Sequence, residues 1–479
     1  MELSLPGLLV FFGLFMLGRW LGGSAVIGLF ASLPFGSTAF ATLWALGGSS
    51  PLIYSMFAAV LIVFTVSRRS FAHDIGTVLR RHPSAWVVVF LVLYAIGASL
   101  ILPRLFAGGT TAFTVYRGGI LELPLAPTSG NITQVAYFAL GAMTFFAIAA
   151  LPARASNLHL LRTGFFAYVA INSVLGIVDL VGKIGAHRDI IFPIRTANYS
   201  LLTEIAEGSF WRIVGGHAEA SSFAIGTASC LAFAFVYWRN SGSRLALALA
   251  VVSLVLLVLS TSSTGYFALA LLLLIFAGTF VHPLLSGRIP VRDLIVVSCV
   301  MVLFAVLLAV YVAEAKLFDP VVKLVDTMIV NKAQSQSGQE RAYWNTRSLL
   351  NVIDTMGLGI GLGSSRASSW IVAVVSQMGI IGTVLMAVLV AELLRGPGHQ
   401  RLAVIDPEAF ALCRAARACA LGFLIGASIS GGAADPGILF FICLAVVVSI
   451  RYELAARSGL SHGFPRTSAI HCDAARSGR

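Results

Sequence analysis

The sequence predicts an all-α, polytopic integral membrane protein with about 12–13 transmembrane helices. Of its 479 residues, 58% are hydrophobic and only 11% are charged, and the mean hydropathy is +0.92. A soluble domain carries roughly 25% charged residues, so the excess apolar surface must face lipid. The apolar runs are roughly 17–25 residues long without strict alternation, which favours helices over a barrel. Helices also satisfy every backbone polar group where water is absent.

Thirteen apolar segments are candidate spans. They are 4–18, 24–46, 51–67, 84–102, 133–152, 164–182, 218–238, 245–260, 262–283, 293–313, 368–392, 412–430 and 436–450. The first is interpreted as a span and not a cleaved signal peptide, because no basic region or A-x-A site accompanies it. The second contains Pro34 and Gly36, which leaves open whether it is one helix or two.

Basic residues set the predicted orientation. One alternate set of connections, with the C-terminal tail, holds 20 of the 32 basic residues, and this set is predicted to be cytoplasmic. The net charge of +12 therefore indicates anionic membrane lipids as partners and does not imply nucleic acid. Residues 1–455 are predicted to form one membrane domain, with external segments at 103–132, 183–217 and 314–367. Residues 456–479 are predicted to be a disordered cytoplasmic tail.

The external segments carry the candidate chemistry in two stretches. The first, 192–222, places Arg195, Arg212, His217 and Glu219 at the entry of the following span. Guanidinium groups at the outer ends of spans do nothing for positive-inside orientation, and they bind phosphate oxygens in a planar, bidentate manner. A carboxylate at the start of an apolar run is costly to leave unpaired. These residues are therefore candidates for an anion site with an adjacent proton acceptor.

The second stretch, 337–382, holds Arg341 on a predicted short interfacial helix, followed by the glycine-rich turn Gly357–Gly363 and then Arg366. Glycines let backbone approach a ligand, and the N–H groups at a helix start can face an anion. The turn lacks Lys-Ser/Thr and a preceding strand, so it is not a P-loop. No histidine or cysteine cluster has zinc spacing, so no metal or other cofactor is expected.

Each candidate also has a purely structural interpretation. An arginine at the interface can extend to water or pair with an acid, His217 can be a packing residue, and glycines serve helix packing in membranes. Asp179 and Lys183, one helical turn apart, are predicted to be a structural ion pair. The sequence alone leaves these alternatives open for Arg195, Arg212, Arg341 and Arg366.

The order of motifs resembles that of the O-antigen ligase and polymerase superfamily of bacterial membrane glycosyltransferases. The resemblance covers roughly residues 190–450. Its pieces are Arg212-Ile-Val-Gly215 with Glu219, the serine-rich turn Leu259–Gly265, Arg341-Ala-Tyr-Trp344, Gly359-Ile-Gly361-Leu-Gly363 and Gly379-Ile-Ile-Gly382.

The resemblance implies a metal-independent, inverting glycosyltransferase of the bacterial inner membrane, with its active site on the periplasmic face. Its partners would be a polyprenyl-pyrophosphate-linked glycan donor and a glycan acceptor, with a chain-length regulator expected for polymerases. Arg212, Arg341 and Arg366, with Arg195 beside them, would hold the pyrophosphate. Glu219 or His217 would position or deprotonate the acceptor hydroxyl.

Two departures from the family pattern bear on which branch the chain resembles. The serine turn reads Ser262-Ser263-Thr264-Gly265 where the family often has an arginine, and Arg366 stands where ligases typically carry a histidine. The second departure favours a Wzy-type O-antigen or exopolysaccharide polymerase over a ligase. A transporter or flippase is the main alternative from another class, but ionisable residues are nearly absent within the spans and no inverted repeat is visible. A non-catalytic scaffold is the third.

Overall fold

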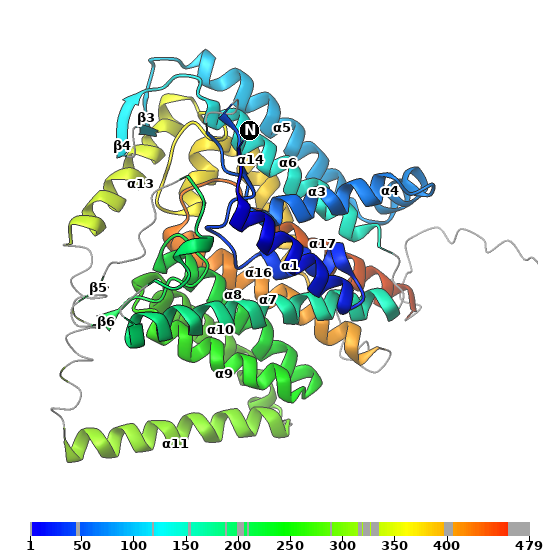
Figure 1. Cartoon of the computed structure of the whole chain (residues 1–479), viewed down its shortest axis with the longest axis vertical. Helices are drawn as coiled ribbons and strands as arrows, with labels where there is room; N and C mark the ends of the chain where they lie inside the picture. The colour runs from blue at the N-terminus through cyan, green and yellow to red at the C-terminus, as the bar shows by residue number, and fades with distance from the viewer. Residues whose placement is uncertain are drawn as a thin grey trace, which may run out of the picture.

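The computed structural model describes residues 2–44, 48–116, 119–151, 155–186, 189–198, 206–207, 210–287, 290–314, 335–396 and 406–457, with residues 319 and 326. The predicted all-α polytopic membrane class is confirmed, because this part of the chain is a bundle of apolar helices with a few short strands (Figure 1). Nine described helices are long and apolar enough to cross a membrane. They are α5 (Pro83–Leu105), α6 (Ser129–Ala149), α7 (Ala155–Val181), α8 (Ala220–Ser241), α10 (Ser263–Leu285), α11 (Val291–Ala313), α14 (Trp370–Leu394), α16 (Pro407–Ser430) and α17 (Gly437–Arg457).

Three shorter apolar helices also coincide with predicted spans: α1 (Leu5–Trp20), α3 (Ile53–Val66) and α9 (Arg244–Leu259). Twelve of the thirteen predicted segments therefore coincide with a helix. The sequence analysis missed α4 (Phe71–Arg81), which bends from α3 by 104°. Its Phe71, Ile75 and Val78 lie on one face and its basic residues on the other, as in a helix at a membrane surface.

The predicted second span, 24–46, is wrong as a helical span. Among the residues of this range that the structure describes, the α-helix is α2 (Ser24–Ser32), and the chain then runs irregularly to the short strand β2 (Ala41–Thr42), which pairs with β1 (Glu2–Leu3). Pro34 lacks an N–H and disfavours continuation of the helix. Polar groups of the irregular segment form hydrogen bonds with a distant part of the chain: the backbone N–H and the Oγ–H of Ser37 both donate to Gly216 O, at 3.0 and 2.8 Å.

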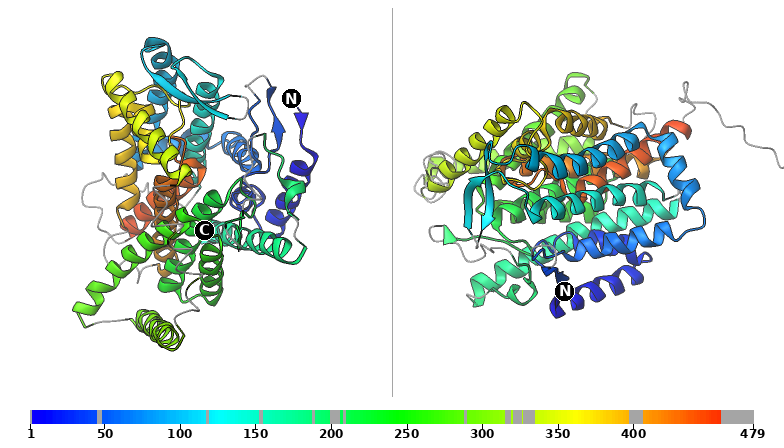
Figure 2. Two further views of the ribbon diagram at one scale, coloured as in Figure 1. Left: turned by 90° about the vertical axis from the view of Figure 1, so that its left-hand side faces the viewer. Right: turned by 90° about the horizontal axis from the view of Figure 1, so that it is seen from above.

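The bundle has two chemically different ends (Figures 1 and 2). The first carries the hairpin of β3 (Thr111–Tyr116) and β4 (Gly119–Pro124), the short pair β5 (Ala206–Glu207) and β6 (Phe210–Trp211), and α13 (Gln336–Asp354). We call it the loop end, and the opposite end, with α4 and the C-terminus of α17, the arginine end. The short helix predicted after Ser337 is confirmed as α13, and its position at a membrane interface stays a prediction. The β3–β4 hairpin was not predicted.

Burial places α8, α16 and α17 in the centre of the bundle. Of the most apolar 18-residue stretch of each helix, 83% is buried in α8 and 0% in α11. Helix α11 lies apart from the other helices in Figures 1 and 2. Gly422 and Gly426 of α16 pack directly against the backbone of α8, where a Cβ would lie 2.9–3.2 Å from the nearest atoms. The central helices thus fix the positions of the segments that begin and end on them at the loop end.

The single membrane domain predicted over residues 1–455 stays a prediction. The prediction of a disordered tail at 456–479 falls on residues that, beyond 457, lie outside the described part of the chain.

Candidate functional site

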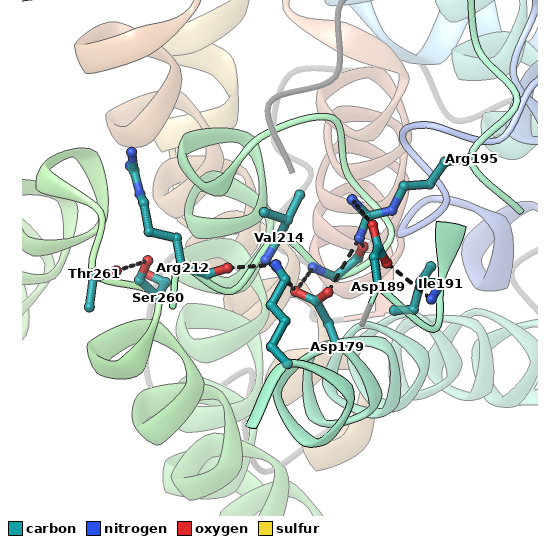
Figure 3. A network of polar contacts seen from close by, with 10 residues as sticks. Asp179, Asp189, Ile191, Arg195, Arg212, Val214, Ser260 and Thr261 are labelled. Carbon is teal, nitrogen blue, oxygen red and sulfur yellow. Dashed lines mark hydrogen bonds and ion pairs between the residues drawn. The ribbon is translucent and has the colours of Figure 1, made fainter. Parts of the chain in front are cut away.

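A buried ion-pair network shapes the segment that leads into α8. The predicted pair of Asp179 and Lys183 is confirmed, with Nζ and Oδ2 3.0 Å apart. Asp179 Oδ2 also accepts hydrogen bonds from Val214 N–H (2.7 Å) and Gly215 N–H (3.1 Å), and Lys183 Nζ donates to Arg212 O at 2.7 Å. One carboxylate therefore holds the backbone of residues 212–215 in place, and with it the residues that follow (Figure 3).

Arg195 belongs to this network. Its side chain is fully buried, 3.4 Å from Asp179 and 3.3 Å from Asp189, and its Nη2 donates to Gly215 O at 2.7 Å. Burial lowers the pKa of Arg195, and the two nearby carboxylates oppose that shift. Figure 3 shows Arg195 turned towards these acids while Arg212 extends away from them. The structure therefore separates Arg195 from the other three predicted arginines and gives it a structural environment.

His217 and Glu219 lie in the last turn before α8. His217 fits between Gly36 and Gly226, where an added Cβ would come within 2.9 and 3.2 Å of its ring nitrogens. Its Nε2 is buried and has no hydrogen-bond partner among the described residues. Burial, with Arg195 nearby, lowers its pKa to about 4, so the ring is neutral at pH 7. Glu219 precedes the first turn of α8 and accepts a hydrogen bond from the Ser221 hydroxyl.

These two side chains line a cavity of about 360 Å³ at the loop end. Arg366 lies on its wall, together with residues of the segment after α2, the start of α3, α7, α8, α14, and the stretch from the end of α16 to the start of α17. The wall is mixed, because aromatic and aliphatic groups such as Trp370, Phe423 and Ile438 alternate with the charged ones. A cavity with a largely apolar lining and a few convergent polar groups is the usual form of a ligand site.

Arg341 and Arg212 add their charges to the same region. Arg341 extends from α13 and its Nη1 donates to Ser430 Oγ, at the end of α16, at 3.1 Å. Burial lowers the pKa of Arg341; Glu219 opposes this shift, whereas Arg212 and Arg366 lower the pKa further. Arg341 is thus close enough to Arg212, Arg366 and Glu219 for each of their charges to act on it. Three cations and one carboxylate in this region give a net positive charge.

Arg366 reaches this position through two close approaches. The backbone N–H of Arg366 donates to Phe113 O of strand β3 at 3.0 Å, and this hydrogen bond connects the segment after the glycine turn to the β3–β4 hairpin. Its side chain passes over Gly432, where a Cβ would lie 3.1 Å from Nε. The side chain itself is exposed, so the guanidinium is accessible from the cavity mouth.

The predicted role of the glycine turn in presenting N–H groups to an anion is wrong. The N–H groups of Ile360, Gly361 and Gly363 donate to Ser376 O, Gln377 O and Gln377 Oε1, and the Leu362 N–H donates to Ser99 Oγ. The turn packs against the break in α14 at Gly379, whose φ of 61° is outside the helical range. A Cβ at Gly359 would lie 2.6 Å from Gly379 N. The glycines therefore allow the close packing of two backbones.

Asp435 is a site residue that the sequence analysis missed. It lies between α16 and α17, lines the same cavity, and its Oδ1 accepts from Gly437 N–H at 2.9 Å. Burial raises its pKa from 3.8 to about 6, although the Gly437 hydrogen bond acts in the opposite direction. The available signal was an acid in the short external connection between two predicted spans.

The serine-rich turn lies beside Arg212 (Figure 3). Ser260, Thr261, Ser262 and Thr264 are all buried, and Thr261 has a φ of 46°, which is strained for a β-branched residue. Within the described residues, no three His, Cys, Asp or Glu side chains come together in a way that could hold a metal ion.

The sequence matches no protein-family model and no curated protein with significant similarity.

Proposed function

We propose that the protein is a membrane glycosyltransferase that polymerises polyprenyl-pyrophosphate-linked oligosaccharide repeats on the outer face of the bacterial inner membrane. The observation that carries the proposal is the group of three arginines at the loop end: Arg366 lines the cavity with Glu219, and Arg341 lies close enough to Glu219, Arg212 and Arg366 for their charges to shift its pKa. A pyrophosphate diester is a compact anion that three guanidinium groups can bind through several charge-assisted hydrogen bonds.

The orientation is part of the same proposal. Arginines and lysines accumulate on the cytoplasmic side of membrane proteins, which places the arginine end and the C-terminus in the cytoplasm. The loop-end cavity then opens on the periplasmic side, where lipid-linked repeats are assembled into polymer.

In the proposed reaction, a hydroxyl of one saccharide attacks the anomeric carbon of a second, lipid-linked saccharide from the face opposite the pyrophosphate. The new C–O bond forms as the bond from the anomeric carbon to the pyrophosphate oxygen breaks, and that oxygen keeps the electron pair. The arginines stabilise the negative charge that develops on the leaving group. The configuration at the anomeric carbon is inverted, and the hydroxyl proton passes to a base of the cavity.

Three residues of the cavity wall can take that proton: Glu219, His217 and Asp435. Neutral His217 has an enclosed Nε2 with no hydrogen-bond partner among the described residues. Asp435 has a pKa near 6, close to the value that suits a general base at neutral pH. The pKa values of His217 and Asp435 differ by about 2 units, so the pH dependence of the rate can distinguish them.

Transport is less well supported by the geometry. The loop-end cavity and a second cavity at the arginine end share no lining residue, and Arg366, whose charge acts on Arg341, lines the loop-end cavity alone of the two. A transported substrate needs a site that both faces can reach in turn.

The test is genetic complementation in a strain that lacks the protein. Arg212→Ala, Arg341→Ala and Arg366→Ala are compared with Arg104→Ala, an exposed arginine at the loop end of α5 that does not line the cavity. Membrane levels of each variant are checked by immunoblot, and surface polysaccharide is separated on a gel. The proposal predicts that the first three variants lose long polymer and accumulate single lipid-linked repeats, while Arg104→Ala makes normal polymer.

Normal polymer in all three cavity variants contradicts the proposal. Long polymer that stays on the polyprenyl carrier, and is missing only from its final acceptor, indicates a ligase instead.

A further inference from the structure

Helix α13 buries polar residues and exposes apolar ones along its second half. The buried side carries three polar residues that are each 0% exposed: Ser348, Asn351 and Thr355. The exposed side carries an apolar stripe at helical spacing, made of Leu349, Leu350, Ile353 and Met356. Ile353 is 72% exposed and Met356 is 87% exposed. A helix that packs on a protein in water has the opposite arrangement, with its apolar stripe towards the core. The stripe of α13 therefore calls for apolar surroundings.

Two hydrogen bonds fix the course of α13 along α14. Asn345 Oδ1 accepts from Ser368 N–H at 2.8 Å, just before α14 begins, and Gly357 O accepts from Ile380 N–H at 2.8 Å, at the break in α14. The same number of residues separates 345 from 357 and 368 from 380, so the two segments run side by side in the same direction. Figure 1 shows α13 slanting from the outer edge of the loop end towards α14. Helix α13 thus descends along the membrane-spanning helix.

The break in α14 lies at membrane depth. Helix α14 has 25 residues, which gives a length of about 37 Å against about 30 Å for a hydrocarbon core. Ile380 is about 15 Å along the helix from Trp370, at 1.5 Å per residue. Even if the whole excess length of about 7 Å lies at the loop end, Ile380 is about 8 Å inside the hydrocarbon.

The stripe of α13 ends beside the lipid-facing side of α14. That side carries exposed apolar residues on a membrane-spanning helix, among them Ile380, Ile381 and Val384. Gly357, the residue after Met356, packs against Ile380, since an added Cβ would lie 2.6 Å from its Cδ1. The exposed apolar surfaces of the two helices are therefore continuous.

Polar groups at the inner end of α13 bond within the protein. Asp354 accepts from the Thr110 hydroxyl at 2.5 Å and pairs with Arg347 at 3.3 Å. The turn that follows has acceptors inside the protein for the N–H groups of Gly359, Ile360, Gly361, Leu362 and Gly363. Irregular backbone is tolerated at membrane depth only where the protein satisfies it in this way.

We propose that residues 349–356 of α13 are inserted among the hydrocarbon chains of the leaflet at the loop end, with the glycine turn as the innermost point of a re-entrant segment. Lipid chains are the partner of the stripe because it continues the lipid-facing side of α14 at the same depth. Insertion to this depth goes beyond a helix that lies flat at the interface. It also anchors α13, and with it Arg341, beside the lipid phase.

The test measures the surroundings of nitroxide labels on purified full-length protein in nanodiscs of phosphatidylcholine and phosphatidylglycerol. The background carries Cys299→Ala and Cys472→Ala, and the four other cysteines are buried. Single labels are placed at Ile353→Cys and Met356→Cys on the stripe. Ile381→Cys is the lipid-facing control on α14, and Ser337→Cys is the control at the exposed outer start of α13. Electron paramagnetic resonance gives the accessibility of each label to oxygen, which dissolves in hydrocarbon, and to a water-soluble nickel complex.

We expect labels at 353 and 356 to be more accessible to oxygen than to nickel, as at 381, and the order to reverse at 337. Greater access of nickel at 353 and 356 would place the stripe in water and overturn the proposal. Low access of both reagents would also overturn it, because a second copy or another part of the protein would then cover the stripe. None of these outcomes depends on what the loop-end cavity binds.

The variant Met356→Asp gives a second measurement. A carboxylate among hydrocarbon chains is costly, so the unfolding temperature in nanodiscs should fall below that of the wild type. Ser337→Asp, at the outer start of the same helix, should not lower it. An unfolding temperature of Met356→Asp equal to that of the wild type would contradict insertion, since an exposed methionine in water can be replaced without loss.

Discussion

The two ends of the bundle use arginine in different ways. At the arginine end three guanidinium groups pair directly with acids: Arg162 with Glu408 at 2.7 Å, Arg239 with Asp293 at 2.6 Å and Arg451 with Glu392 at 2.5 Å. At the loop end Arg341 lies among Glu219, Arg212 and Arg366, and the two other arginines add to the effect of burial in lowering its pKa, which Glu219 opposes.

The comparison separates structural arginines from candidate binding arginines within one chain. A matched pair neutralises itself and leaves little field for a ligand. A crowded cluster is electrostatically unfavourable until an anion enters, so its repulsion is offset only by binding. Arg195 extends the same distinction to the loop end, since it lies between Asp179 and Asp189 and contributes to packing.

The largest expected effect is on stability and comes from Asp179→Ala. This change leaves Lys183 and Arg195 buried without their shared carboxylate and releases the N–H groups of Val214 and Gly215. Breaking a buried pair in this way costs about 3–5 kcal/mol. We expect a much lower unfolding temperature and poor accumulation in membranes, measured by thermal unfolding in detergent. An unfolding temperature equal to that of the wild type would show that the network does not hold the site segment.

Arg366→Gln is expected to have the next largest effect, and to act on activity alone. Removing one stabilising group for the leaving-group charge should lower the turnover rate by roughly 10²-fold. Because the side chain is exposed and repelled by its neighbours, the unfolding temperature should stay the same or rise. Turnover is measured with purified protein and a lipid-linked repeat. Parallel loss of turnover and stability would instead assign Arg366 a structural role.

Asp435 gives a pH test of the same site. Its pKa is raised to about 6, so the folded state favours the protonated carboxyl. That contribution to stability is complete below about pH 4 and is lost as the pH rises through 6. If Asp435 is the base, the reaction rate rises over the same pH range in which this contribution to the free energy of unfolding is lost. Asp435→Asn should remove both changes, and retention of the rate increase near pH 6 would exclude Asp435 as its source.

The smallest effect is expected at the arginine end. Arg162→Ala removes a pair whose two side chains are 30% and 44% exposed, so the loss of stability should be about 0.2–1 kcal/mol. Turnover should be unchanged, because Arg162 does not line the loop-end cavity. A tenfold loss of turnover with normal stability would contradict the division between the two ends.

The fold was largely predictable because length and hydropathy decide where a helix can cross a bilayer. The exception, 24–46, is apolar enough to span but depends on backbone partners such as Gly216 O that lie far away in the sequence. The β3–β4 hairpin did carry a signal, since Gly118-Gly119 separates two runs of alternating residues. Within a long external segment that signal was overlooked.

The site was predictable in part for a related reason. Arg341, Arg366, His217 and Glu219 are unusual in their positions at span ends, and the structure brings them together. Arg195 and Arg212 look alike in the sequence, and only the fold around Asp179 distinguishes them. The hydrogen bonds of the glycine turn were equally invisible, because its partner is an irregular break inside α14.

The most direct test of the central claim is the affinity of purified protein for polyprenyl pyrophosphate, the proposed leaving group, measured in detergent by isothermal titration. The cluster predicts that the wild type binds it, that Arg341→Ala binds it at least about tenfold more weakly, and that Arg104→Ala binds it like the wild type. Equal affinities in all three proteins would show that the crowded arginines are not a pyrophosphate site.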